Sequence, residues 1–78
     1  MPTTNDIIAA IAEHLGLNPE DVDRHALLSE ELNLGPIELN DLLQHLSRKF
    51  GIAFDPADMS DLKKVDDLVV LVEDNLLD

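Results

Sequence analysis

The strongest constraint on this chain is an apolar stripe with helical spacing, enclosed between Gly35-Pro36 and Gly51. Proline suits the first position of a helix, because its missing N–H has no partner there, and glycine is a common C-terminal stop. The stripe predicts an amphipathic helix over residues 36–50, with one face turned toward a core. The residues of that face are Leu39, Leu42, Leu43, Leu46 and Phe50.

Three further segments favour helices. The first begins at Thr3 or Thr4, both good N-cap residues, and ends at Gly16. A short one begins near Pro56. The last runs from about residue 65 to residue 77; its valines make a strand the local competitor, but its length and helical period favour a helix. The apolar stripes of the first and last helices are Ile7, Ile8, Ile11 and Leu15, and Val65, Leu68, Val69, Val72 and Leu76.

A long connection, residues 16–35, joins the first two main helices. A loop of about 20 residues would count against the assignment unless it packs on the core. Its apolar residues can provide that packing, and Asn18-Pro19-Glu20-Asp21 predicts a turn within it. We therefore predict an all-α bundle in a single domain over residues 1–78, with three main helices, a short third helix and a long first loop. The apolar loop residues are Val22, Ala26, Leu27, Leu28, Leu32 and Leu34.

Charge and composition exclude several classes of function. Seventeen acidic residues against five basic ones give a formal net charge of -12, which repels nucleic acid and anionic membranes but attracts basic patches on proteins. The chain has no cysteine, so it has no disulfide and no thiolate. No apolar run is long enough to cross a membrane, and the amino terminus lacks the features of a signal peptide. We expect a cytoplasmic protein that binds neither nucleic acid nor membranes.

Several segments follow the pattern of a known family. Residues 15–22 (LGLNPEDV), residues 26–32 (ALLSEEL), the step from Phe54 to Pro56 and the stripe of the central helix all have matching spacing. In this combination the chain resembles the acyl carrier protein family over nearly its whole length. The resemblance implies that family's four-helix bundle and a non-enzymatic protein of fatty-acid or polyketide-type metabolism.

The resemblance breaks at the position where the family attaches its cofactor. In an Asp-Ser-Leu motif at the start of the second helix, the family's serine hydroxyl is joined to phosphopantetheine. Here these positions read Gly35-Pro36-Ile37. Pro36 has no hydroxyl, so the resemblance implies that phosphopantetheine, although expected for the family, cannot be attached there. It further implies a scaffold or regulator, a monomer on its own, in place of a loaded carrier.

The resemblance also implies a contact surface. The family's partners dock basic patches on an acidic second helix, and Glu38 and Asp41 fit that pattern, whereas Arg48-Lys49 departs from it. The predicted partners are basic patches on enzymes of acyl metabolism. The predicted partner-binding residues are Glu30, Ile37, Glu38 and Asp41.

Two alternatives remain open. The chain could be a working carrier that is modified at Ser29, Ser47 or Ser60, or that holds lipid non-covalently in its core. It could also be a small enzyme, but it has no cysteine and no histidine constellation, so we predict no catalytic residue. We also predict no metal site. The histidines do not pair at one-turn spacing, and the acidic residues near the short helix lack the glycine and closing glutamate of a calcium loop. These residues are His14, His25 and His45, and Asp55, Asp58 and Asp61.

Overall fold

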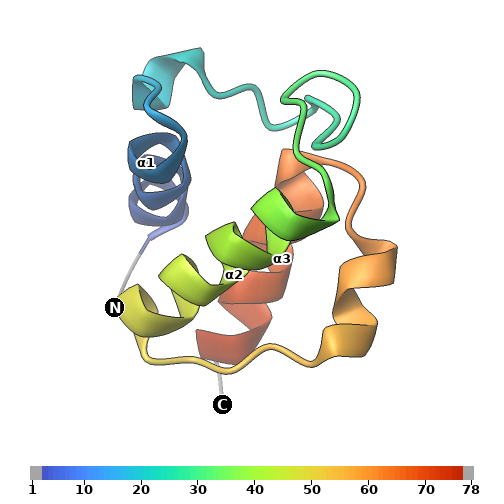
Figure 1. The fold of residues 1–78 in the computed structure, drawn as a ribbon. Coiled ribbons are helices and arrows are strands. Elements are labelled where there is room, and N and C mark those ends of the chain that lie inside the picture. The colour runs from blue at the N-terminus through green and yellow to red at the C-terminus, as the bar shows by residue number, and fades with distance from the viewer. Residues whose placement is uncertain (1–2, 77–78) are drawn as a thin grey trace.

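The computed structural model describes residues 3–76, and this part of the chain contains three α-helices and two short 3-10 helices (Figure 1). The predicted all-α fold is confirmed. The predicted short third helix is a 3-10 helix, as is the predicted turn in the first loop, and the predicted last helical residue, Leu77, lies outside the described residues. In chain order the elements are α1 (Thr4–Leu15), η1 (Pro19–Asp21), α2 (Pro36–Phe50), η2 (Pro56–Asp61) and α3 (Val65–Leu76).

Reciprocal capping fixes the start of α1. The backbone N–H of Asp6 donates to Thr3 Oγ1 at 3.2 Å, and the backbone N–H of Thr3 donates to Asp6 Oδ2 at 2.8 Å. These bonds favour the ionised carboxylate and lower the pKa of Asp6. At the other end Gly16 adopts a left-handed conformation with φ of 72°, which ends the helix as predicted.

The start and end of α2 also follow the sequence signals. Gly35 is the N-cap in extended conformation, Pro36 is the first helical residue, and Gly51 ends the helix with φ of 65°. The predicted apolar face is buried, apart from the half-buried Phe50. Because α1 packs against both α2 and α3, this face closes one common core (Figure 1).

The long first loop is part of that core. Val22, Ala26, Leu28 and Leu34 are buried with the helical side chains, which confirms that the loop is held by packing. Burying a large aliphatic side chain contributes about 1.5–3 kcal/mol, so Val22, Leu28 and Leu34 offset part of the entropy cost of ordering the connection.

Backbone hydrogen bonds join this loop to the segment before α3. The N–H of Leu28 donates to the carbonyl of Lys63 at 2.8 Å, and the N–H of Val65 donates to the carbonyl of Ala26 at 3.0 Å. An isolated antiparallel bridge between Leu27 and Lys64 lies between these two bonds. The middle of the loop is therefore fixed to the start of α3.

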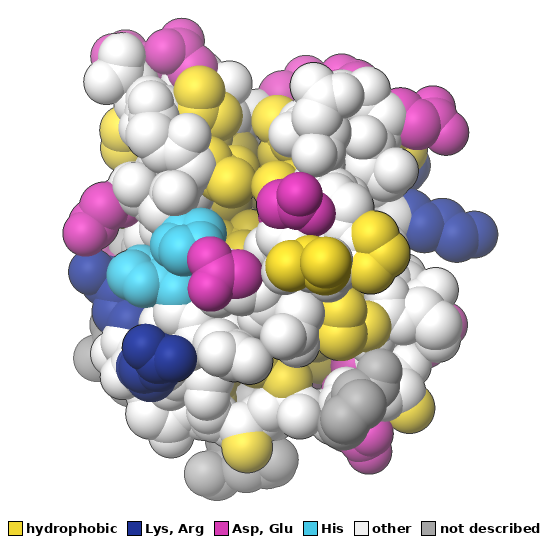
Figure 2. Space-filling model, viewed as in Figure 1, with side chains coloured by type: hydrophobic (Ala, Val, Ile, Leu, Met, Phe, Trp, Pro, Cys, Tyr) yellow, Lys and Arg dark blue, Asp and Glu magenta, His cyan; other side chains and the backbone are white. Residues whose placement is uncertain are grey.

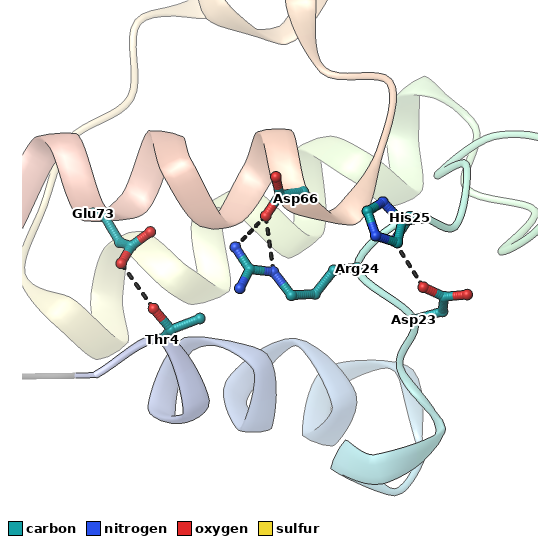
Figure 3. Close-up of polar contacts among 6 residues, drawn as sticks. All are labelled: Thr4, Asp23, Arg24, His25, Asp66 and Glu73. Atoms are coloured by element: carbon teal, nitrogen blue, oxygen red, sulfur yellow. Dashed lines mark hydrogen bonds and ion pairs between the residues drawn. The ribbon is translucent and has the colours of Figure 1, made fainter.

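Two side-chain contacts join α3 to the first loop and to α1 (Figure 3). Arg24 Nε donates to Asp66 Oδ1 at 2.8 Å, which ties the loop to the first turn of α3. Thr4 Oγ1 donates to Glu73 Oε2 at 2.9 Å, which ties the start of α1 to the last turns of α3. The two contacts hold α3 at both ends.

Candidate functional site

The start of α2 has no hydroxyl group. Its first turn consists of Pro36, Ile37, Glu38 and Leu39, and Pro36 itself is exposed. A phosphodiester to a serine needs a side-chain oxygen nucleophile, and none of these four side chains supplies one. The residues at this turn therefore do not fit a covalently attached phosphopantetheine.

Two serines nevertheless lie close to this turn. A groove of about 320 Å³ lies between the first loop, the start of α2 and η2. It brings Ser29 and Ser60 together beside Pro36, although they lie on different segments of the chain. This proximity was not predicted, because it depends on how η2 and the first loop pack beside the start of α2. Its lining consists of Ser29, Leu34, Gly35, Pro36, Leu39, Met59 and Ser60.

The three serine hydroxyls differ in their surroundings. Ser29 is exposed. Ser60 is exposed, and its Oγ donates to the carbonyl of Ala57 at 2.9 Å. Ser47 is half-buried, and its Oγ donates to the carbonyl of Ile52 just after the end of α2. Ser47 thus has a structural role, while Ser29 and Ser60 are accessible.

Three of the four predicted partner-binding residues lie together on the first two turns of α2. Ile37 is 81% exposed, about twice as much as Leu17 or Val70, the other exposed large hydrophobic residues among those described. Glu38 and Asp41 are also exposed, and Asp41 lies one turn after Ile37. An apolar side chain beside two carboxylates is a surface that a basic, partly apolar partner would complement.

The fourth predicted residue, Glu30, lies off α2. It is exposed and lines an adjoining groove opposite Lys63, and the two grooves share Ser29, Leu34 and Leu39. The neighbouring Glu31 has a local structural role, because its Oε1 accepts the backbone N–H of Leu27 at 3.3 Å. Glu30 therefore lies on the loop side of a groove system that extends to Pro36.

A histidine pair lies next to the α2 surface. The rings of His14 on α1 and His45 on α2 stack with centroids 4.7 Å apart. His14 Nε2 lies 3.1 Å from Asp41 Oδ2, whereas His45 Nε2 is buried and has no hydrogen-bond partner. Figure 2 shows histidine side chains directly beside an acidic one on this face. The spacing of histidines along the sequence did not predict this pairing between helices.

Other carboxylates have structural roles. Asp55 Oδ1 accepts the backbone N–H of Ala57 at 2.9 Å and caps η2. Asp67 Oδ2 accepts the backbone N–H groups of Lys63 and Lys64, and these bonds lower the pKa of Asp67. Within residues 3–76 no three histidine or carboxylate side chains are arranged to hold a metal ion. The helices of this region are too short or too polar to cross a membrane.

Comparisons with known proteins agree with this fold. The sequence profile of the family described as "Phosphopantetheine attachment site" matches residues 5–72. The chain is 30% identical to the acyl carrier protein of Chlamydia muridarum over 74 residues, covering 95% of this chain and 96% of the relative. It is 32% identical to the acyl carrier protein of Thermotoga maritima over 66 residues, covering 85% and 82%.

A solved structure gives the same result. The crystal structure of an acyl carrier protein from Thermotoga maritima superimposes with a TM-score of 0.75 at 25% identity, covering 91% of this chain and 82% of that one. These relatives are carrier proteins and not enzymes, in agreement with the prediction of a non-enzymatic protein. The chain belongs to the acyl carrier protein family.

Proposed function

We propose that this chain is a family member without a phosphopantetheine arm, which binds proteins of fatty-acid or polyketide-type metabolism as a scaffold or regulator. The observation that carries the proposal is the first turn of α2. It begins at Pro36 and contains no hydroxyl, yet the exposed Ile37 and the carboxylates of Glu38 and Asp41 surround this position. A docking surface can therefore exist without the attachment chemistry.

The ends of α2 support placing Pro36 at the family's attachment position. The family attaches its cofactor at the start of its second helix, and here Gly35 and Gly51 set both ends of that helix. The buried leucines of α2 fix its rotation about its own axis, so a shift of register would move them out of the core. Ser47 lies near the far end of α2 with its hydroxyl already bonded.

An intact-mass measurement tests the loss of the arm. The purified chain is incubated with coenzyme A and a phosphopantetheinyl transferase, and its mass is compared with that of the untreated chain. We expect no change for the wild type and a gain of one phosphopantetheine for the matched control, the double variant G35D/P36S. A mass gain by the wild type would contradict the proposal, and peptide mapping would then locate the modified residue.

Charge reversal tests the docking surface. We expect the double variant E38K/D41K, and separately I37D and E30K, to weaken binding to purified enzymes of fatty-acid synthesis. The matched control is E20K/D21K, which changes the net charge by the same amount at the exposed η1. Equal weakening by both double variants would indicate a general charge effect, and unchanged binding by E38K/D41K would contradict the proposed surface.

A second candidate function is a working carrier modified elsewhere. It is favoured by one observation, namely that Ser29 and Ser60 line the same groove as Pro36. If the wild type gained mass with the transferase, S29A or S60A would identify the carrier residue by abolishing that gain. A carrier that holds lipid non-covalently would instead release it on organic extraction of the native protein.

A further inference from the structure

Asp41 faces both solvent and the histidine pair. Its side chain is 69% exposed, and its Oδ2 lies 3.1 Å from His14 Nε2. The contact joins α1 to the second turn of α2. Neutral imidazole can donate one hydrogen bond here, whereas protonated imidazole turns the contact into an ion pair. A basic partner would therefore compete with His14 of the same chain for the Asp41 carboxylate.

The two rings of the pair have different surroundings. His45 Nε2 is buried without a partner, so protonating His45 would require an unpaired N–H to stay buried. Two protonated rings with centroids 4.7 Å apart would also repel each other. Of the two rings, His14 is the one whose Nε2 faces a carboxylate.

The other charged groups on the elements around the histidine pair contact other residues or are exposed. On the α1–α2 face, Glu13 Oε2 lies 3.5 Å from Lys49 Nζ, and Arg48 Nη2 lies 3.5 Å from Gln44 Oε1. The elements packed against α1 carry further carboxylates. Those on η1 and Asp74 on α3 are exposed, and the other three on α3 contact Arg24, the backbone N–H groups of Lys63 and Lys64, and Thr4. Asp41 is thus the carboxylate that contacts His14. The η1 and α3 carboxylates are Glu20, Asp21, Asp66, Asp67, Glu73 and Asp74.

We propose that His14 is a proton-controlled competitor for Asp41, and that acidification withdraws this carboxylate from the docking surface. His45 is a positioning residue, which holds the His14 ring against Asp41 by stacking. The inference rests on the proposed docking function, because it describes the regulation of that surface. The proposal applies between about pH 8 and pH 5, the range in which histidine side chains generally change charge while aspartate and glutamate side chains generally stay ionised.

A partner-free measurement tests the link between the two residues. The side-chain carboxyl carbon of Asp41 is followed by ¹³C NMR between about pH 8 and pH 5, the range in which histidine titrates. We expect an inflection in the wild type and in H25Q, whose substituted histidine is exposed and lies outside the pair, and none in H14Q. We expect H45A to weaken the inflection while the helical circular dichroism stays unchanged. An inflection that persists in H14Q would overturn the proposal.

A binding measurement tests the consequence for docking. The probe is a synthetic peptide in which arginine and lysine flank a leucine. We expect the wild type and H25Q to bind it about two- to five-fold more weakly at about pH 5.5 than at about pH 8, the range for one exposed ion pair, and H14Q to lose that difference. A difference that persists in H14Q would overturn the regulation. If E38K/D41K left peptide binding unchanged, the docking surface itself would fail, whatever the NMR result.

Discussion

The carboxylate of Glu38 lies over Gly35, so that a Cβ atom built on Gly35 would lie 2.8 Å from Glu38 Oε2. Gly35 has φ of -74° and ψ of 178°, a conformation open to any residue, so a larger residue there would only have to displace the flexible Glu38 side chain. A negative charge is favourable at a helix N-terminus. Glu38, on the first turn of α2, thus occupies space that a larger N-cap side chain would need.

This contact predicts coupling between the two positions. In the wild-type background G35D should change the free energy of unfolding by less than about 0.5 kcal/mol, because the gain from a capping aspartate is offset by crowding against Glu38. In the E38A background the same substitution should stabilise the protein by up to about 1 kcal/mol. Urea denaturation of the four proteins gives the coupling energy. Equal effects of G35D in both backgrounds would show that the two side chains do not interact.

Replacing the proline at the start of α2 should cost little. Proline at the first helical position restricts the unfolded chain and loses no hydrogen bond, so P36S should lower the free energy of unfolding by about 0.4–1 kcal/mol. The buried leucines of α2 remain, so the helical circular dichroism should be unchanged. P19S, at the start of η1, is a matched control outside the site. A P36S variant that unfolds would show that Pro36 is needed for folding.

The two faces of α2 should respond differently to truncation. Leu42 is fully buried, so L42A should destabilise the protein by about 2–5 kcal/mol through lost contacts and a cavity. Ile37 is 81% exposed, so I37A should change stability by less than about 0.5 kcal/mol while weakening partner binding. Urea denaturation and the binding assay measure the two effects separately. A strongly destabilising I37A would mean that Ile37 stabilises the fold and is not free for docking.

Local signals were enough to predict the helices. Gly16, Gly35-Pro36 and Gly51 lie where the structure starts or ends a helix, because capping and proline geometry depend on neighbouring residues alone. The 3-10 form of η2 was not predicted. Its start at Pro56 and the Asp55 cap are compatible with either helix type over so short a segment.

The site could be predicted only in part. Ile37, Glu38 and Asp41 share the start of one helix, so their proximity follows from their spacing. The pairing of His14 with His45 depends on how α1 crosses α2, which periodicity does not determine. The groove shared by Ser29, Pro36 and Ser60 likewise depends on where η2 packs. Contacts between distant segments were therefore the part that the sequence did not reveal.

Salt should stabilise this chain. A formal net charge of -12 on 78 residues makes the folded state repel itself, and added salt screens that repulsion. We expect Tm to rise between about 10 mM and about 150 mM NaCl, over which the Debye length falls from about 30 Å to about 8 Å. Differential scanning calorimetry measures the shift. A Tm that is constant or falls over this range would mean that the ion pairs of the fold outweigh the net repulsion.

Asp67 should make stability depend on acid pH. Its carboxylate accepts the backbone N–H groups of Lys63 at 3.1 Å and Lys64 at 3.0 Å, and these bonds hold the pKa of Asp67 below its ordinary value of 3.8. Because the folded-state pKa is the lower one, the contribution is complete above about pH 4–5 and is lost as pH falls through the folded value.

D67N keeps an acceptor oxygen but loses the charge. At pH 7 we expect it to be less stable than the wild type by about 0.5 kcal/mol, a value reduced by solvent screening at this half-buried site. The deficit should shrink below about pH 4, where protonation removes the wild-type charge as well. D61N, which removes an exposed carboxylate from the neighbouring η2, is the matched control. Urea denaturation at several pH values measures both variants, and a deficit of D67N that stays constant down to pH 2 would show that the charge of Asp67 is not the stabilising element.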